Sequence, residues 1–399
     1  MSLIDHSDPP ALVDRIIVHQ FDPGRPSPGG IDTCLRGICR YLPADETVAI
    51  IGVDTGAGPS TRQLGLWERH RVGEQEFWFL PVVALDPADQ NRRVPHSIRL
   101  IGGILRYWRK MPQRRIVQVH RMDSAAALRF ILPAAQVYCV HTQENGLVGT
   151  TSDSFWRYFG ILHQRLEQSV VRNASAVVVF NEDYAKVVQT WNPRAVFSPT
   201  WYDPALIDAE GEHKNEYEVL WVGRLETPKD PELAVRAFRE LMAMDSDQPW
   251  TLQIVGSGTR TDDVEAAVRA APELVQQRIV LRGRVEPSQV AQEMGRAGIF
   301  LMTSHPGYEG YPRVLVEAMA SGLPAVVTQG SDTGLLVADG VTGYTCSRNP
   351  QELAARIDDA RAISRSEVKA AVAKLDAPSL VSRIFSLSNG LAEQKDGVA

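Results

Sequence analysis

The stretch His305-Pro-Gly-Tyr-Glu309-Gly-Tyr-Pro-Arg-Val-Leu-Val-Glu317-Ala-Met-Ala-Ser-Gly322-Leu-Pro324 connects a predicted strand, 299–303, to a predicted helix. Pro312 suits the first helical position, because it lacks the N–H group that would be unsatisfied there. The free N–H groups at such a helix start favour a bound phosphate. Glu309 and Glu317 stand eight residues apart, so one carboxylate can accept bonds from sugar hydroxyls and the other from paired ribose hydroxyls. Two isolated glutamates would indicate only local pairing, but the complete stretch favours a ligand site.

Alternating strands and helices surround this stretch. Short β-branched apolar runs alternate with segments of helical period, which predicts parallel sheets with helices on both faces. The polar segment 208–215 divides the runs into two sets, so we expect two doubly wound, Rossmann-like domains, 1–208 and 209–375. Ligands of such sheets bind at the carboxyl ends of the strands, so a cleft between the domains is the expected active site. The predicted strands are 15–19, 48–53, 77–81, 116–120, 137–141 and 176–180 in the first set, and 217–222, 251–255, 279–282, 299–303 and 325–328 in the second.

Composition and charge narrow the class of protein. The chain has 399 residues, more than one core usually holds, with 44% hydrophobic and 23% charged residues. The net charge of −6 argues against general nucleic-acid binding. Residues 1–208 carry 22 basic and 21 acidic side chains, against 20 and 27 in the remainder, so the N-terminal half is better suited to an anionic surface. Cysteines without metal-ligand spacing, a polar N-terminus and the lack of an apolar run of about 18 residues predict a cytoplasmic protein.

A second motif follows the predicted strand 217–222. Gly223 and Arg224 end that strand, and Lys229 comes five residues after Arg224, before a predicted helix. A diphosphate leaving group needs its growing negative charge neutralised, for which arginine supplies a fork of donors and lysine a point charge. Two exposed loop cations are the other interpretation of this pair. Gly256 ends the next strand in a similar turn, which is a common feature of α/β domains.

Histidines stand at two adjacent strand ends of the N-terminal domain. His120 ends the strand 116–120, and His141 ends the strand 137–141, so both face the expected ligand edge. A single histidine is more often structural, whereas two in adjacent positions favour a functional role. The loop after the first strand contains Gly29-Gly30, where a glycine lets the backbone approach a ligand closely.

These motifs together resemble those of glycosyltransferase family 4, the retaining glycosyltransferases with the two-domain GT-B fold. The pair Glu309/Glu317 matches the family's Glu-x7-Glu motif, and Gly223-Arg224…Lys229 matches its Gly-Arg…Lys motif. Ala318-Met-Ala-Ser-Gly-Leu-Pro-Ala-Val-Val327 and Asp339-Gly-Val-Thr-Gly-Tyr344 are further typical stretches. The resemblance covers nearly the whole chain and is densest from 219 to 345. It is specific for the family and not for a substrate.

The resemblance implies a function. The implied activity moves a hexose-type sugar from a nucleoside-diphosphate donor to a glycan or lipid-linked acceptor, in cell-surface polysaccharide or glycolipid synthesis. The implied reaction retains the anomeric configuration and uses neither a metal ion nor another cofactor. The segment 376–399 is implied to be a helix that crosses back to the N-terminal domain, followed by a tail.

The resemblance also implies residue roles. Arg224 and Lys229 would hold the diphosphate, Glu309 the transferred sugar and His120 a sugar hydroxyl, and these four are the implied catalytic residues. Glu317 would bind the ribose, and the base would lie near the turn 282–284. The implied donor-binding residues are Gly29, Gly30, Gly223, Gly256, Arg282, Gly283, Gly310, Tyr311, Pro312, Arg313 and Glu317. His141 and Asp123 are candidates on the acceptor side.

Two segments depart from the family pattern. The usual Pro-Asn-Gly-Val-Asp string is here Pro199-Thr-Trp-Tyr-Asp203, so the segment between the domains is altered. Where family members often begin a helix with a glutamate, this chain has Ser331-Asp-Thr-Gly-Leu-Leu-Val337. Because the second segment is expected near the donor, the resemblance does not fix the donor preference.

The expected mechanism follows from the lack of an obvious nucleophile. We expect front-face attack through an oxocarbenium-like state, in which the leaving phosphate helps to take the acceptor proton. Glu309 as a covalent nucleophile is the alternative. Asp245-Ser-Asp247 resembles a metal-binding Asp-x-Asp motif, but it stands in a polar turn after a helix, so we expect no metal there.

A basic segment, Arg92–Arg115, holds eight basic residues and no acidic one. Ile98, Ile101, Leu105 and Trp108 form one stripe of a predicted helix, with basic residues on another face. Either this stripe packs on the sheet beneath a solvated basic face, or the segment meets an anionic membrane surface that presents a lipid-linked acceptor, which would make the protein peripheral.

Two other functions stay open. A sugar-nucleotide epimerase of the same fold would need an acid/base pair around the sugar, which these motifs do not supply. A catalytically inactive homologue would bind a nucleotide sugar or a partner enzyme. The joint presence of His120, Arg224, Lys229, Glu309 and Glu317 argues against such a loss of activity.

Overall fold

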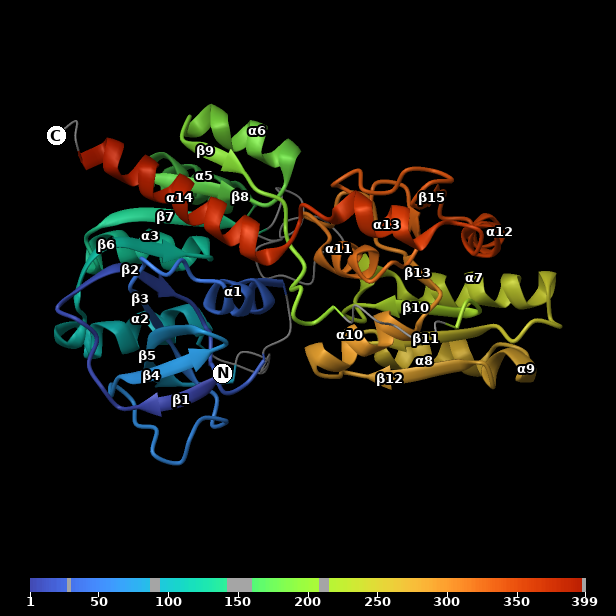
Figure 1. Cartoon of the computed structure of the whole chain (residues 1–399), viewed down its shortest axis with the longest axis horizontal. Coiled ribbons are helices and arrows are strands. Elements are labelled where there is room, and N and C mark those ends of the chain that lie inside the picture. The colour runs from blue at the N-terminus through green and yellow to red at the C-terminus, as the bar shows by residue number, and fades with distance from the viewer. Residues whose placement is uncertain (27–29, 87–93, 142–159, 208–214, 397–399) are drawn as a thin grey trace. The chain divides into compact units, whose positions relative to one another are not determined.

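The computed structural model describes residues 1–26, 30–86, 94–141, 160–207 and 215–396, and it divides into two units, each built on its own sheet (Figure 1). The chain passes from the first unit to the second after Ser198 and returns to the first after Asp376. Gly29, Arg92, Arg93 and most of the linker 208–215 lie outside the described residues.

The first unit contains a nine-stranded sheet in the order β1-β4-β5-β3-β2-β6-β7-β8-β9. The strands from β5 to β9 in this order pair in parallel. β4 is antiparallel to both β1 and β5, so the expectation of a purely parallel sheet is wrong at this edge. The strands are β1 (Ser2–Asp5), β2 (Leu12–Val18), β3 (Val48–Asp54), β4 (Glu68–Val72), β5 (Gln75–Ala84), β6 (Gln113–Val119), β7 (Ala135–Val140), β8 (Ala176–Val179) and β9 (Ala195–Phe197).

Helices of the first unit include the C-terminal helix of the chain. The helices are α1 (Gly30–Arg40), α2 (His96–Arg106), η1 (Trp108–Lys110), α3 (Met122–Ile131), α5 (Gly160–Asn173), α6 (Glu182–Trp191) and α14 (Ala377–Asp396). α14 packs against β7, β8 and α1 (Figure 1). It is also held by Arg15 of β2, a fully buried side chain that donates to Ser388 Oγ at 2.9 Å and to Asn389 Oδ1 at 2.7 Å.

The second unit contains a six-stranded sheet in the order β12-β11-β10-β13-β14-β15, in which every pair is parallel. This is the order of the doubly wound Rossmann sheet. The strands are β10 (Glu218–Val222), β11 (Thr251–Val255), β12 (Ile279–Gly283), β13 (Ile299–Met302), β14 (Ala325–Thr328) and β15 (Gly343–Cys346). The helices are η3 (Thr227–Lys229), α7 (Pro231–Met244), α8 (Thr261–Arg269), α9 (Glu273–Gln276), α10 (Pro287–Arg296), α11 (Arg313–Ala320), α12 (Pro350–Ala360) and α13 (Arg365–Val372).

Each sheet reverses its winding direction at one pair of strands. In the second unit β11 and β12 lie on one side of β10, while β13 and the strands after it lie on the other. In the first unit the same reversal lies between β2 and β6. The loops after the two strands of such a pair diverge and leave a crevice at their carboxyl ends, where ligands of open α/β sheets bind. The loops after β10, β13, β2 and β6 are therefore the places to look for a site.

Helix α2 buries a different face from the one that an apolar stripe would predict. Its buried residues are His96, Ser97, Leu100, Gly103 and Ile104, and Gly103 lies close to the backbone of Val82 on β5. Ile98, Leu105 and Trp108 are 59%, 51% and 57% exposed, so the interpretation in which this stripe packs on the sheet is wrong. Among the residues that the structure describes, none of the helices combines the length and the hydropathy of a membrane span.

A buried ionic cluster holds the loop after β2. Arg62 donates to Asp22 Oδ1 at 2.8 Å and to both oxygens of Glu68 at 2.9 Å, and all three side chains are at most 2% exposed. Asp22 also accepts from the N–H and the hydroxyl of Thr55. Burial raises the pKa of Asp22, but the bonds from Thr55 and Arg62 outweigh it and lower that pKa below the usual value. The cluster is therefore charged at neutral pH.

Removing the arginine should strongly destabilise the first unit. We expect Arg62→Ala to lower the free energy of unfolding by about 3–5 kcal/mol, because it leaves two buried carboxylates without their cation. Urea unfolding followed by circular dichroism measures the change. Arg71→Ala, which removes an arginine paired with Glu76 at the exposed end of β4, is the matched control and should change stability little. Equal effects of the two substitutions would contradict the prediction.

Candidate functional site

Lys229 and Glu309 form an ion pair at the switch point of the second unit, between the loops that follow β10 and β13. Lys229 Nζ lies 2.6 Å from Glu309 Oε1, and the two side chains are only 15% and 11% exposed. Ser304 Oγ donates to the same carboxylate oxygen at 2.6 Å. The structure thus brings together two predicted residues that stand eighty positions apart in the chain.

Hydrogen bonds to the backbone fix the position of Lys229. Lys229 ends η3, and the left-handed Asp230 that follows, with a φ of 41°, caps α7. Thr303 Oγ1 donates to the carbonyl oxygens of Lys229 and Asp230 at 2.9 and 2.8 Å, and it accepts from the indole N–H of Trp221 at 2.9 Å. Arg348 bonds the Asp230 carboxylate. Sequence reasoning missed Thr303 and Arg348, and the only signal for Thr303 was its place directly after a strand.

Tyr308 contacts both predicted diphosphate-binding cations. Its hydroxyl accepts from Arg224 NH2 at 3.0 Å, and Lys229 Nζ lies 5.7 Å from the centre of its ring. Arg224 NH1 also bonds Glu226 at 2.6 Å, yet the arginine side chain is 50% exposed. Burial raises the pKa of Tyr308 to about 12, so the phenol is neutral. Arg224 therefore presents its guanidinium to solvent from a fixed position beside Lys229.

Three glycines line the carboxyl edge of this sheet next to the cations. The Gly223 N–H donates to Val255 O at 3.0 Å, and the Gly256 N–H donates to Gly283 O at 2.9 Å. Gly256 has a φ of +143°, and a Cβ there would lie 1.8 Å from the carbonyl oxygen of Gly223. Only glycine fits this contact. The turns that follow β10 and β11 are therefore packed tightly against each other at this edge.

The segment 310–313 leads from Glu309 into α11. Pro312 is the N-cap of α11 and not its first helical residue, which corrects the expectation by one position. Thr333 Oγ1 donates to the carbonyl oxygen of Gly310 at 2.8 Å. Thr200 Oγ1 lies 3.4 Å from the carbonyl oxygen of Tyr311. The two segments that depart from the family pattern, 199–203 and 331–337, therefore both support this loop.

Arg313 is held by the altered segment 199–203. Its NH1 donates to the carbonyl oxygen of Trp201 at 2.9 Å, and its guanidinium lies 5.0 Å from the centre of the fully buried Trp201 ring. Glu317 is half-buried one helical turn further along α11. Burial raises the pKa of Glu317 to about 7, although Arg313 opposes the rise, and Asp203 adds to it. The Glu317 carboxyl therefore changes its charge near neutral pH.

Arg282 does not join the other candidate residues. Its Nε donates to Gln253 Oε1 at 3.0 Å, and its NH2 lies 3.6 Å from Glu293 of α10. Gln253 in turn donates to Glu293 at 2.6 Å. Because successive side chains of a strand point to opposite faces, Arg282 lies over the sheet, while Gly283 reaches the glycine edge.

His120 and His141 are in direct contact at the carboxyl edge of the first unit. His120 Nδ1 lies 2.8 Å from His141 Nε2, and the two rings stack with centres 5.1 Å apart. His19, which follows β2, lies edge-on to His120 with ring centres 6.1 Å apart. Burial lowers the pKa of His120 to about 3, and the positive charge of Arg15 adds to this effect. Sequence reasoning missed His19, although it follows its strand in the same way as His120.

The remaining candidates of the first unit have other neighbours. Gly30 is the first residue of α1. Asp123 lies in the first turn of α3, where it bonds Arg121 NH2 at 2.9 Å and the Ser124 N–H at 2.8 Å. Ser97 of α2 also bonds the Asp123 carboxylate and lowers its pKa. An acceptor-side role for Asp123 stays a prediction.

One group within the described residues has the composition of a metal site. The ligand atoms of Cys34, His120 and His141 all lie within 4.8 Å of one another. A metal ion bound to His120 would displace a hydrogen bond, because Nδ1 is bonded to His141 and Nε2 to Gln118 at 2.9 Å. A reaction without a metal ion stays a prediction.

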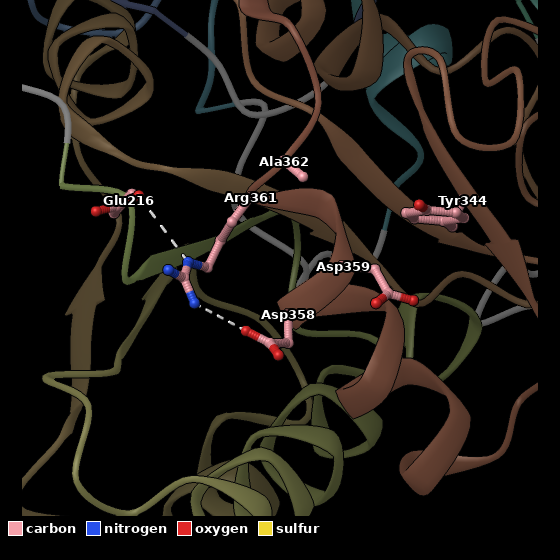
Figure 2. Close-up of a pocket in the computed structure, with 6 residues that line it drawn as sticks. All are labelled: Glu216, Tyr344, Asp358, Asp359, Arg361 and Ala362. Carbon is pink, nitrogen blue, oxygen red and sulfur yellow. Dashed lines mark hydrogen bonds and ion pairs between the residues drawn. The ribbon is translucent and has the colours of Figure 1, made fainter.

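The second unit also has a polar depression (Figure 2). It is lined by Glu216, Tyr344, Asp358, Asp359, Arg361 and Ala362. Arg361 extends between Asp358, at 2.9 Å, and Glu216, at 4.0 Å (Figure 2). Because Glu216 precedes the amino end of β10, the depression is not at the carboxyl edge, and we assign no ligand to it.

Comparison of sequences finds similarity to glycosyltransferases within the second unit. Residues 216–361 match the family model described as "Glycosyl transferases group 1". A D-inositol 3-phosphate glycosyltransferase of Nocardia farcinica is 30% identical over 128 residues, which cover 31% of this chain and 28% of that protein. A glycogen synthase of Mycobacterium tuberculosis is 33% identical over 153 residues, 37% of this chain and 36% of that protein. The chain thus spans about a third of the length of the curated relatives it matches.

Comparison of structures extends over both units. Sucrose-phosphate synthase from Thermosynechococcus elongatus is similar with a TM-score of 0.70 and 17% identity, over 95% of this chain and 99% of that one. Anabaena HepE in complex with UDP-glucose is similar with a TM-score of 0.64 and 16% identity, over 96% of this chain and 100% of that one. The predicted fold class, α/β of the GT-B type, is confirmed by these neighbours.

The raised pKa of Glu317 predicts a pH-dependent stability. Glu317 loses its proton near pH 4.5 in the unfolded protein and near pH 7 in the folded protein. The free energy of unfolding therefore falls as the pH rises between these two values. We expect Glu317→Gln to be increasingly stabilised relative to the natural protein from pH 5 to pH 8, as measured by thermal unfolding. Glu265→Gln on the exposed face of α8 is the control. If the melting temperatures of Glu317→Gln and the natural protein differed by the same amount at every pH, the raised pKa of Glu317 would be refuted.

Proposed function

We propose that this protein is a glycosyltransferase that moves a hexose-type sugar from a nucleoside-diphosphate donor to a glycan or lipid-linked acceptor in polysaccharide or glycolipid synthesis. The observation that carries the proposal is the Lys229–Glu309 pair at a topological switch point, beside Arg224 and the glycine edge. The family match of residues 216–361 supports it. The solved complex of HepE with UDP-glucose makes a UDP-sugar the first donor to test.

The diphosphate would lie against Arg224 and Lys229. Arg224 is half-exposed and already oriented by Glu226 and Tyr308. Lys229 is neutralised by Glu309, and an arriving diphosphate would share its charge. Oriented cations stabilise the charge that develops on the leaving diphosphate.

The two glutamates would bind hydroxyl groups. Glu309 accepts from Lys229 and Ser304 through Oε1, which leaves Oε2 to accept from a sugar hydroxyl. Glu317 would accept from the paired hydroxyls of the ribose, most strongly when ionised above pH 7. The segment between them, 310–313, would place the N–H groups at the start of α11 near the donor.

The reaction we propose is a front-face substitution. The bond between the anomeric carbon and the diphosphate oxygen breaks, and the acceptor oxygen forms a bond to the same face of the carbon. The acceptor proton passes to the leaving phosphate oxygen, so no base from the protein is consumed. The protein orients the donor and stabilises the leaving charge.

Substitutions of the ion pair should abolish turnover and leave the fold intact. We expect Lys229→Ala and Glu309→Ala each to lower the rate of UDP release from UDP-glucose in the presence of acceptor by at least about 100-fold. A coupled UDP assay measures the rate, and circular dichroism checks the fold. The matched control is Arg269→Ala, which breaks an exposed ion pair with Glu265 on α8 and should keep full activity. Near-normal activity in either site variant would overturn the assignment.

Binding without turnover would favour the inactive homologue. A thermal shift with UDP, GDP or ADP identifies the nucleotide by linkage. Interconversion of the donor sugar without transfer would favour an epimerase. No shift with any nucleotide would remove the donor site from the second unit.

We further propose that the exposed face of α2 and η1 meets an anionic lipid surface that presents the acceptor. Ile98, Leu105 and Trp108 expose more than half of their surface, and Arg106, Arg109 and Lys110 are exposed beside them. The described sequence from 94 to 122 contains no acidic residue. Apolar side chains among basic ones are typical of binding to the membrane interface.

Vesicle sedimentation tests the lipid surface. We expect the protein to bind vesicles that contain phosphatidylglycerol and not vesicles of phosphatidylcholine alone, with the binding weakened by salt. Trp108→Glu should reduce the bound fraction several-fold, because it removes apolar area and adds a like charge to the lipid. Met244→Glu at the exposed end of α7 is the control and should bind normally. Equal binding of both variants, or none by the natural protein, would exclude this surface.

A further inference from the structure

A chain of hydrogen bonds leads from the buried Arg15 to the histidines at the carboxyl edge of the first unit. Arg15 NH1 donates to Gln118 Oε1 at 2.7 Å. Gln118 Nε2 lies 2.9 Å from His120 Nε2, and His120 Nδ1 lies 2.8 Å from His141 Nε2. Arg15, Gln118 and His120 are at most 3% exposed. Water therefore competes little for these bonds.

The chemistry of arginine sets the direction of every bond in this chain. A guanidinium only donates, so Gln118 must turn its carbonyl oxygen to Arg15 and its NH2 group to His120. His120 Nε2 must then accept, so it carries no proton. The neutral imidazole has its proton on Nδ1, which donates to His141 Nε2. A proton on both nitrogens of His120 would set an N–H against the Gln118 NH2 group.

At the Arg15 end of this series of hydrogen bonds, the guanidinium is held by α14. Arg15 also donates to Ser388 Oγ and Asn389 Oδ1, and Glu46 Oε2 lies 3.9 Å from its Nε. Together with Gln118, these three residues fix the position of the guanidinium. Gln118 therefore cannot rotate its amide without leaving Arg15 NH1 without an acceptor. A buried donor without an acceptor would destabilise the fold. The orientation of Gln118 is thus set by residues far from the histidines in the sequence.

We propose that Arg15 and Gln118 are positioning residues that hold His120 as the neutral Nδ1–H form, so that His120 offers a ligand a hydrogen-bond donor and not an acceptor. His120 makes two hydrogen bonds. Arg15 fixes the one to Gln118, whereas a ligand can replace the partly exposed His141 in the other. An oxygen atom of a ligand would replace His141 Nε2 as the acceptor. This inference rests on the proposed function only in taking that ligand to be a donor sugar.

Nitrogen NMR of protein labelled with 15N-histidine tests the form of His120 without any substrate. We expect His120, identified by the signals lost in His120→Asn, to carry its proton on Nδ1 from pH 5 to pH 8. Gln118→Glu sets a carboxylate between Arg15 and His120 Nε2, so the proton should move to Nε2. Gln118→Met removes the donor, so the two neutral forms should both be populated.

A matched substitution separates positioning from structural support. Gln136 is another buried glutamine, on β7, and its amide donates to the carbonyl oxygen of Ala125 at 3.0 Å. We expect Gln136→Met to leave the His120 form unchanged even where it lowers the melting temperature. Nε2–H or doubly protonated His120 in the natural protein at pH 7 would overturn the proposal. An unchanged His120 form in folded Gln118→Glu would overturn it as well.

Kinetics then connect the His120 form to the proposed transfer. Gln118→Glu should lower kcat by about tenfold or more, the size of one lost hydrogen bond, and leave nucleotide binding to the second unit unchanged. An unchanged kcat together with the expected NMR shift would mean that His120 does not donate to the sugar, which overturns the ligand part of the proposal. Absent turnover in the natural protein refutes the proposed function, while the NMR result still decides the positioning role.

Discussion

The reversal of winding at one pair of strands in each sheet is the constraint on which the candidate sites depend. Strands inside a parallel sheet are buried on both faces and carry apolar side chains, so polar chemistry is confined to the strand ends. At the reversal the neighbouring loops diverge and leave room for a ligand. Lys229 and Glu309 follow β10 and β13, and His19 and His120 follow β2 and β6. Residues distant in sequence become neighbours because their strands are neighbours at the reversal.

Partners for buried charge determine much of the remaining structure. Taking a charge out of water is costly unless hydrogen bonds and an opposite charge replace the solvent. Arg62 meets this need with two carboxylates, and Lys229 meets it with Glu309. Arg15 is bonded chiefly to neutral groups, Gln118, Ser388 and Asn389, which accept from it and so take on a fixed orientation. The same requirement that stabilises the fold therefore also orients polar groups near the histidines.

Sequence patterns predicted the elements that local residue preferences determine. The buried strands were recognisable from apolar β-branched runs, and the strand–loop–helix around Glu309 was recognisable from its motif. The edge strand β1 was missed because it has only four residues, and β4 was missed because all but one of its residues are charged or histidine. The face that α2 buries was predicted wrongly in one interpretation, because its sequence has apolar residues on two faces, and packing on β5 selects the one with Leu100, Gly103 and Ile104.

Tertiary contacts decided what the sequence could not predict. Thr303, Arg348 and Gln118 acquire their roles from partners remote in the chain, and no spacing rule points to such partners. The resemblance implied that Arg282 binds the donor, but strand alternation turns its side chain to Gln253 and Glu293. The candidate residues were therefore found by motif, while their supporting contacts required the structure.

The segment 199–203 acts through Arg313 and Asp203 on Glu317, which we propose to bind the ribose of the donor. Trp201 occupies a fully buried position, and its carbonyl oxygen and ring hold Arg313. Asp203 in the same segment adds to the raised pKa of Glu317, which Arg313 opposes. The segment thus acts on this carboxyl through two opposing charges, one of its own and one that it positions. Because a ribose binds best to the ionised carboxylate, the composition of this segment bears on the pH range in which the donor site would be occupied.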